Sequence, residues 1–187
     1  MLLIDSPPRA VLRRMVRVAR RRFAGAFERH AEGLARLEAD LGWGRQDVIT
    51  LASIVEAEAA VAAELPVIAG VFLNRLRDPE FRPKRLQADP TVSYGCRLQP
   101  SLPSCAGFDG RRITRAMLAG ADNPYNTYRH EGLPPGPVGN PGLAAVEAVL
   151  APAEHDYLYF VARGGGRHAF SATLEEHNRA VERYLRR

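Results

Sequence analysis

The stretch TLASIVEAEAAVAAE, residues 50–64, carries its apolar side chains at the spacing of an α-helix. At about 100° per residue, one side of this predicted helix is formed by Leu51, Ile54, Val55, Val61 and Ala62. Glu58 falls near the middle of that side, whereas Glu56 points roughly the opposite way. A carboxylate on the buried face of a helix loses hydration, which raises its pKa. The stretch therefore predicts a helix with one buried apolar face and singles out Glu58 as an unusual acid on that face.

The composition is typical of a globular domain. The chain has 187 residues, of which 46% are hydrophobic and 25% charged, and this is enough for one domain with a real core. No apolar run approaches the roughly 20 residues that a membrane-spanning helix needs. No signal peptide is recognisable, because the charges of MLLIDSPPRAVLRR follow its short apolar start rather than precede it. We expect one α+β domain dominated by helices over residues 8–187, after a disordered leader over residues 1–7.

Turn and helix signals divide this domain into elements. A small β-hairpin is predicted where YLYFVA and HAFSA flank the glycines of RGGGR. Thr173 and Glu176 fit a capping box at the start of the last helix. Residues 81–105 are predicted to be irregular with short extended pieces, and residues 122–142 to form a long ordered loop rich in Pro, Gly and Asn. Helices are predicted at residues 8–41 with Gly33 as a candidate break, at 50–64 after a turn and cap formed by Gly42, Gly44 and Asp47, and at 65–77, 114–118, 143–152 and beyond Thr173.

Arginine supplies nearly all of the positive charge. The formal net charge is +5, and Lys84 is the only lysine among 26 basic residues. The densest run is an amphipathic segment with seven arginines, namely Arg9, Arg13, Arg14, Arg17, Arg20, Arg21 and Arg22. Two interpretations stay open, a solvated helix face or attraction to an anionic surface such as lipid headgroups, nucleic acid or an acidic polymer. Because such one-sided use of arginine also reflects codon composition, we expect no nucleic-acid partner.

The two cysteines, Cys96 and Cys105, lie in YGCRLQPSLPSCAG, a segment rich in Pro and Ser. A bridge between them would close a short loop, with a gain of about 2–3 kcal/mol, and would imply an oxidising compartment. The residues leave open a disulfide or two free thiols, and they favour the disulfide. Zinc ligation is not expected, since no second cysteine pair and no histidine lie nearby. No metal or organic cofactor is indicated.

The chemistry of the chain is expected to rest on carboxylates. The sequence contains no His-Glu-x-x-His helix, phosphate-binding loop or Gly-x-Ser-x-Gly elbow. A glutamate with a raised pKa can hold a proton near neutral pH and act as a general acid, typically in glycoside cleavage. The alternative is that Glu58 is a helix residue paired with an arginine such as Arg75. Glu56 is interpreted as a solvent-facing residue of the same helix.

Four segments, in this order, resemble the endolytic murein transglycosylases of the YceG-like family. They are ASIVEAEA…IAGVFLNRL, LQADPTVSYG, NPYNTYRHEGLPPGPVGNPGLAAVEA and YLYFVARGGGRHAFSATLEEHNRAV. The resemblance extends from about Pro8 to the end of the chain. Its second and third motifs are long and unusual, so chance agreement is negligible. The resemblance implies the fold of a YceG-like catalytic domain.

What the resemblance implies for function is cleavage of peptidoglycan glycan strands without net hydrolysis. The bond between N-acetylmuramic acid (MurNAc) and N-acetylglucosamine (GlcNAc) would be broken to leave 1,6-anhydro-MurNAc ends. The implied catalytic acid is the second glutamate of Glu-x-Glu, here Glu58, with Glu56 as the fallback. Because the substrate supplies its own nucleophilic hydroxyl, no second carboxylate is required, and Asp89 would be the second acid only in a hydrolase.

The same motifs supply candidates for a sugar-binding groove. Amide side chains suit the N-acetyl and hydroxyl groups of a glycan, and aromatic faces suit sugar rings. Asn74 is also expected to tie its helix to the helix of Glu58, whereas His168 and His177 are interpreted as structural. The candidate substrate-binding residues are Asn74, Gln87, Asp89, Thr91, Tyr94, Tyr125, Asn126 and Tyr128.

Members of this family are usually longer, with an N-terminal membrane helix and a LysM-like module that this sequence does not show. The resemblance implies action on the periplasmic face of the inner membrane, control of glycan strand length, and peptidoglycan synthases as partners. The cysteine-bearing loop looks like an insertion after TVSYG. The alternative hypothesis is a non-catalytic peptidoglycan-binding or scaffold protein that keeps the groove.

Overall fold

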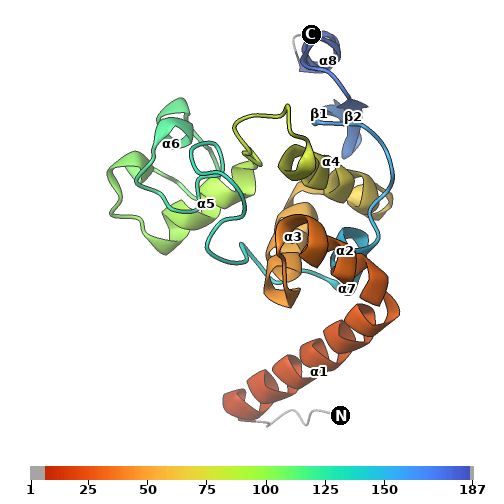
Figure 1. Cartoon of the computed structure of the whole chain (residues 1–187). Coiled ribbons are helices and arrows are strands. Elements are labelled where there is room, and N and C mark those ends of the chain that lie inside the picture. The colour runs from red at the N-terminus through yellow and green to blue at the C-terminus, as the bar shows by residue number, and fades with distance from the viewer. Residues whose placement is uncertain (1–6, 186–187) are drawn as a thin grey trace.

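The computed structural model describes residues 7–185, and most of this part of the chain is helical (Figure 1). The α-helices are α1 (Pro8–Arg29), α2 (Ala31–Leu41), α3 (Arg45–Glu58), α4 (Leu65–Arg77), α5 (Asp89–Leu98), α6 (Arg115–Ala119), α7 (Leu143–Leu150) and α8 (Leu174–Leu185). Two 3₁₀ turns, η1 (Ala62–Glu64) and η2 (Pro103–Cys105), and two strands, β1 (Tyr159–Gly164) and β2 (Arg167–Ser171), complete the fold. The predicted α+β class with dominant helices is confirmed. Apart from Pro7, the predicted leader lies outside the described residues.

The first helical segment is interrupted at His30, not at Gly33. α1 ends just before His30 and α2 begins just after it, so Gly33 lies inside α2. A Cβ atom at Gly33 would lie 1.9 Å from the backbone oxygen of Leu150. The glycine therefore lets α2 pack closely against the end of α7. The break predicted near Gly33 is present, three residues earlier at His30.

The helix that carries residues 50–58 starts at the predicted cap but ends earlier than expected. The Asp47 carboxylate accepts a 2.8 Å hydrogen bond from the Gly44 N–H and closes the first turn of α3. At the other end Ala59 is extended, with φ −86° and ψ 114°. Pro66 lacks an N–H and is accommodated in the first turn of a separate helix, α4. Glu58 is therefore the last residue of α3, whereas the sequence pattern had placed it in mid-helix.

The helical core consists of α3, α4 and α7, which pack against one another. Both the predicted apolar side of α3 and the opposite position Ala52 are fully buried, because α3 is covered on more than one side. The expected burial fails only beyond the helix end, where Val61 is half-buried and Ala62 is exposed. The largest fully buried side chains of the core are Leu51, Ile54, Ile68, Phe72, Leu73 and Leu150.

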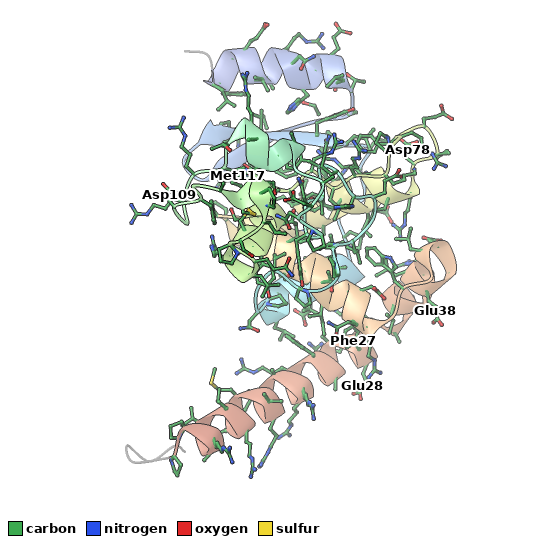
Figure 2. The ribbon with its side chains drawn as sticks, turned by 90° about the vertical axis from the view of Figure 1, so that its left-hand side faces the viewer. Phe27, Glu28, Glu38, Asp78, Asp109 and Met117 are labelled. Atoms are coloured by element: carbon green, nitrogen blue, oxygen red, sulfur yellow. A yellow bond between two sulfur atoms is a disulfide. The ribbon has the colours of Figure 1, made fainter. Side chains whose placement is uncertain are left out.

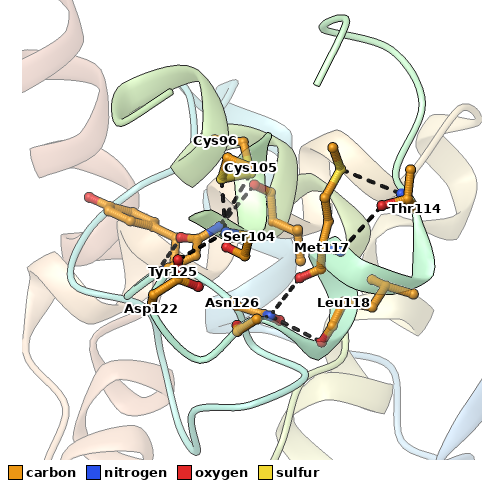
Figure 3. The surroundings of a disulfide bond; sticks show 12 residues. Cys96, Ser104, Cys105, Thr114, Met117, Leu118, Asp122, Tyr125 and Asn126 are labelled. Atoms are coloured by element: carbon orange, nitrogen blue, oxygen red, sulfur yellow. Dashed lines mark hydrogen bonds between the residues drawn. A yellow bond between two sulfur atoms is a disulfide. The ribbon is translucent and has the colours of Figure 1, made fainter. Parts of the chain in front are cut away.

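Residues 89–130 form a second unit, the disulfide-containing region, which lies beside the core in Figure 1. The prediction that residues 81–105 are irregular was wrong for α5, whose first turn contains an acidic residue and Pro90, both favourable there. Cys96 and Cys105 are joined by a disulfide (Figure 3). Gly95 allows the Asn123 side chain to approach α5, since a Cβ at Gly95 would lie 1.9 Å from the Asn123 Oδ1. The Asn123 amide donates to the Val92 carbonyl at 3.2 Å.

A small antiparallel hairpin and α8 pack beyond α4. The register of β1 and β2 pairs Tyr159 with Ser171 and Phe160 with Phe170, and the predicted hairpin is confirmed. The Phe160 ring meets the core ring of Phe72 edge-on at 5.8 Å. The predicted capping box of α8 is present, because Thr173 and Glu176 bond each other's backbone N–H at 3.2 Å. In the part of the chain that the structure describes, no helix is both long and apolar enough to cross a membrane.

Candidate active site

Glu58 stands at the C-terminal end of α3, where the helical core meets the disulfide-containing region. Its side chain is largely removed from solvent, and burial, helped by the negative charge of Asp89, raises its pKa from 4.5 to about 7. The positive charge of Arg75 opposes this rise without cancelling it. Glu56, by contrast, is exposed and lies beside Gly142 of the loop before α7. The two glutamates thus differ as the helical pattern predicted, and Glu58 is the one that holds a proton near neutral pH.

Asp89 and Tyr128 form a hydrogen-bonded pair next to this glutamate. Asp89 is the first residue of α5, and the Tyr128 hydroxyl donates to its Oδ1 at 2.6 Å. Burial, the hydrogen bond to Asp89 and nearby negative charge raise the pKa of Tyr128 above its usual range. The phenol therefore stays protonated, and its hydrogen bond holds the Asp89 carboxyl group in place on one side of Glu58.

Arg75 is a buried cation that ties three segments together. Its Nε donates to the Leu158 carbonyl at 2.7 Å, and a terminal nitrogen donates to the Leu86 carbonyl. Burial lowers its pKa to about 10. Four aromatic rings lie 5.7–5.9 Å from its guanidinium carbon, those of Phe72, Phe81, Tyr159 and Phe160.

The hypothesis that Glu58 is neutralised by pairing with Arg75 does not describe this geometry. Within residues 7–185 no ion pair joins the two side chains, and the guanidinium is occupied by backbone carbonyls. Sequence reasoning missed this structural role of Arg75. The available signal was a lone arginine in the apolar run of α4, whose only other basic residue is the terminal Arg77.

The loop that leads into α5 is fixed by two threonines from different motifs. Thr91 and Thr127 are buried, and their hydroxyls lie 2.9 Å apart. Thr91 also donates to the Ala88 carbonyl at 2.7 Å, and Thr127 accepts from the Ala88 N–H at 3.1 Å. These bonds fix Asp89 relative to Tyr128, so Thr91, a predicted sugar contact, instead holds the loop.

Gln87 occupies a strained position in the same loop. Its φ is +54°, in the left-handed region that residues other than glycine rarely adopt. Its N–H donates to the Thr127 carbonyl at 3.1 Å, which helps to hold this conformation. The side chain is exposed close to Asp89, and backbone strain of this kind gathers at ligand-binding positions.

The remaining predicted substrate-binding residues fall into two groups. Tyr94 and Tyr125 are half-exposed, with ring centroids 4.9 Å apart, and present aromatic surface. Asn126 is fully buried, and its amide donates to the carbonyls of Met117, Leu118 and Gly120 (Figure 3). Because its donors are used inside the protein, the expectation that Asn126 contacts sugar was wrong.

Asn74 is also a structural residue. Its amide donates to the carbonyls of His155 and Tyr157 at 2.7 and 3.1 Å. It therefore ties α4 to the segment before β1, and the expected link to the Glu58 helix was wrong. The connection between α3 and the long loop comes instead from Ser53, whose hydroxyl accepts from the Val138 N–H at 2.9 Å.

The segment that follows Glu58 is anchored by hydrogen bonds between Glu64 and His168. Glu64 at the end of η1 accepts from the His168 backbone N–H at 3.1 Å and lies 2.8 Å from its Nδ1. Hydrogen bonds from His168 outweigh the effect of burial and lower the pKa of Glu64. His168 is thus structural, as interpreted. Among residues 7–185, no three His, Cys, Asp or Glu side chains gather as metal ligands would.

Comparison with known proteins places this geometry in a family. The model of the YceG-like family matches residues 3–183. The chain belongs to the YceG-like family. A crystal structure of a yceG-like protein from Listeria monocytogenes superposes with a TM-score of 0.71 at 34% sequence identity, over 96% of this chain and 50% of that one.

Two curated relatives of the YceG-like chain carry a functional name. The endolytic murein transglycosylase of Bacillus subtilis is 42% identical over 138 residues, which are 74% of this chain and 34% of the relative. The endolytic murein transglycosylase of Streptococcus pneumoniae is 34% identical over 144 residues and matched over 24% of its length. The chain thus spans about a quarter to a third of these relatives.

Proposed function

We propose that this protein is a lytic transglycosylase that cleaves the MurNAc–GlcNAc bond of peptidoglycan glycan strands and leaves 1,6-anhydro-MurNAc ends. The observation that carries the proposal is Glu58, a largely buried carboxyl group with a pKa of about 7. Such a group is protonated often enough to act as an acid at neutral pH and is ionised readily enough to act next as a base. Cutting within strands, as the names of the curated relatives describe, and limiting strand length are part of the proposal.

One acid suffices for this reaction. Protonated Glu58 gives its proton to the glycosidic oxygen, the bond from MurNAc C1 to that oxygen breaks, and the GlcNAc end leaves as an alcohol. The resulting carboxylate takes the proton from the MurNAc C6 hydroxyl, whose oxygen bonds to C1. Protons and electron pairs balance within the substrate and Glu58, and neither water nor a second nucleophile is consumed.

Asp89 and Tyr128 support this cycle without entering it. The anion of Asp89 favours the protonated form of Glu58 before the reaction and stabilises the positive charge that develops at C1. Its 2.6 Å hydrogen bond from Tyr128 fixes its position.

The glycan is proposed to bind beside Glu58, where α3 meets the disulfide-containing region. Gln87, Tyr94 and Tyr125 offer an exposed amide and aromatic faces there. A hexose ring stacks well on such faces, and an amide bonds its N-acetyl groups. We place the reaction on the periplasmic face of the inner membrane, beside peptidoglycan synthases. The Cys96–Cys105 disulfide supports an oxidising compartment.

The deciding experiment compares Glu58→Gln with the matched control Glu56→Gln, two residues away on the same helix. Purified sacculi and uncross-linked strands are digested, and the ends are identified by mass spectrometry. We expect anhydro ends from the wild type and from Glu56→Gln, and a loss of roughly 10²–10⁴-fold in Glu58→Gln. Loss in Glu56→Gln alone would move the role to the fallback residue.

Two other outcomes would replace the proposal. Reducing ends would identify a hydrolase and make Asp89 the next residue to change. Strands that bind but are not cut by any of the proteins would favour the alternative of a non-catalytic peptidoglycan-binding or scaffold protein. That alternative is disfavoured by the pKa of Glu58, since a purely binding groove has no need of a desolvated acid.

A further inference from the structure

Helix α1 joins the body only at its C-terminal end. Ala26 and Phe27 are buried there, and Figure 2 labels Phe27 where the helix meets the core. From that point α1 extends away from the rest of the molecule in both views (Figures 1 and 2). Its 22 residues correspond to a length of about 33 Å.

The projecting part carries large apolar side chains in solvent. Half of the exposed large hydrophobic residues found within residues 7–185 belong to it: Leu12, Met15, Val16 and Val18, with 60, 60, 50 and 42% of their surface exposed. At 100° per residue these four side chains lie on the same side of α1 as Ala26, which is buried in the core. The apolar stripe of α1 therefore extends well beyond the protein that could cover it.

The opposite side of α1 is rich in arginine. Six of the seven arginines of residues 9–22 fall there or at its margins, and Arg22 lies among the apolar residues. No aspartate or glutamate occurs between Pro8 and Phe27. From Pro8 to Phe27 the helix thus combines a wide apolar side with a polar side that carries only positive charge, the pattern of helices that lie in a membrane interface.

We propose that α1 binds the surface of an anionic phospholipid bilayer, with its axis along the interface. Leu12, Met15 and Val16 enter the boundary between headgroups and acyl chains. The arginine stems extend past them so that the guanidinium groups reach lipid phosphates. The catalytic body is then held at the membrane by the buried junction at Phe27.

Charge distinguishes this occupant from the others. A second copy of α1 would bring two arginine-rich helices together, and between Pro8 and Phe27 neither has an acidic residue to offset the charge of the other. A nucleic acid or an acidic polymer would neutralise the arginines but would leave the apolar side in water. An anionic bilayer satisfies both sides at once, because it offers phosphates and hydrocarbon at the same boundary.

Vesicle co-sedimentation with the full chain tests this proposal. Vesicles of phosphatidylcholine alone are compared with vesicles that also contain phosphatidylglycerol, at low and high salt. We expect binding to the anionic vesicles only, weakened by salt. The double variant Leu12→Ser/Met15→Ser should lower affinity roughly tenfold or more, given the apolar area removed from the contact. The control Leu98→Ser/Leu174→Ser changes two residues with 54 and 55% exposure elsewhere and should bind as the wild type does.

Three other results would contradict the proposal or identify a different partner of α1. No sedimentation of the wild type with anionic vesicles overturns the proposal. Salt-sensitive binding that the Leu12→Ser/Met15→Ser change leaves intact would identify a partner that uses charge alone, such as an acidic polymer. A dimer in analytical ultracentrifugation that the same change abolishes would identify a second copy. Circular dichroism verifies folding of both variants, and none of these readouts depends on the proposed glycan chemistry.

Discussion

The helical core and the disulfide-containing region are stabilised in different ways. In the core, α3, α4 and α7 pack aliphatic and aromatic side chains that are almost completely buried. The disulfide-containing region is held together by the Cys96–Cys105 bond and by two buried asparagines, Asn123 and Asn126. The amides of these asparagines donate hydrogen bonds to backbone carbonyls. The core is therefore stabilised by a large buried apolar area, whereas the second region is stabilised by the disulfide and a few buried hydrogen bonds.

This difference matters because the candidate site takes residues from both. Glu58 comes from the end of a core helix, and Asp89 and Tyr128 come from the disulfide-containing region. Weakening the core should unfold the whole protein. Weakening the second region should separate Asp89 from Glu58 and impair catalysis before global unfolding occurs.

The largest effect on stability is expected from Phe72→Ala. Phe72 is fully buried and packs edge-on against Phe160, so its removal leaves a cavity that α4 cannot close. We expect a loss of about 4 kcal/mol in the free energy of unfolding, measured by urea denaturation. Leu98→Ala, at an exposed position, is the control and should have little effect. If Phe72→Ala lowered the free energy of unfolding by less than about 1 kcal/mol, the core would be able to repack. The two regions would then differ less in how they are stabilised than we propose.

The next effect is expected from Cys96→Ser/Cys105→Ser. The disulfide spans a sequence separation of 9 residues, so its loss should cost about 2–3 kcal/mol. Hydrogen exchange should quicken from α5 to α6 and stay slow in α3 and α4. Equal acceleration in both regions would show that they unfold as one unit, against the proposed separation.

A smaller effect is expected from Asn126→Ala. Three carbonyls lose their donor, and we expect a loss of about 2 kcal/mol, together with reduced strand cleavage because Tyr128 follows two residues later. Asn140→Ala, at an exposed asparagine of the long loop, is the control and should change neither property. If Asn126→Ala weakened glycan binding at unchanged stability, Asn126 would be a sugar contact after all.

The same contrast explains how far the sequence could predict this protein. Apolar periodicity found α4, α7 and the hairpin, and it separated Glu58 from Glu56, because core burial leaves a repeating pattern. It failed for α5, whose sequence DPTVSYGCRL has few apolar residues and is fixed by partners distant in the chain. The motifs, in turn, assigned Asn126 to the substrate, since nothing in a sequence reveals that an amide will meet three carbonyls. Motif resemblance brought these residues to attention without distinguishing contact from support.

The smallest and most specific effect concerns the pH dependence of cleavage. Glu58 must be protonated to act as an acid, so the rate should fall as pH rises through about 7, the pKa of this carboxyl group. Asp89→Asn keeps an oxygen that can accept from Tyr128 but removes the negative charge that helps to raise this pKa. The midpoint of the alkaline fall should therefore move below that of the wild type. It should stay above 4.5, because burial is the larger cause of the shift.

Stability gives an independent measurement of the same group. A carboxyl whose pKa is higher in the folded than in the unfolded state binds its proton more tightly when folded, so its ionisation reduces stability as pH rises from about 4.5 towards 7. Glu58→Gln should remove this part of the pH dependence, whereas Glu56→Gln should retain it. An Asp89→Asn midpoint equal to that of the wild type, with the Glu58 dependence of stability intact, would mean that Asp89 lies too far from Glu58 in solution to act on it. The disulfide-containing region would then contribute substrate contacts to the site but no electrostatic support.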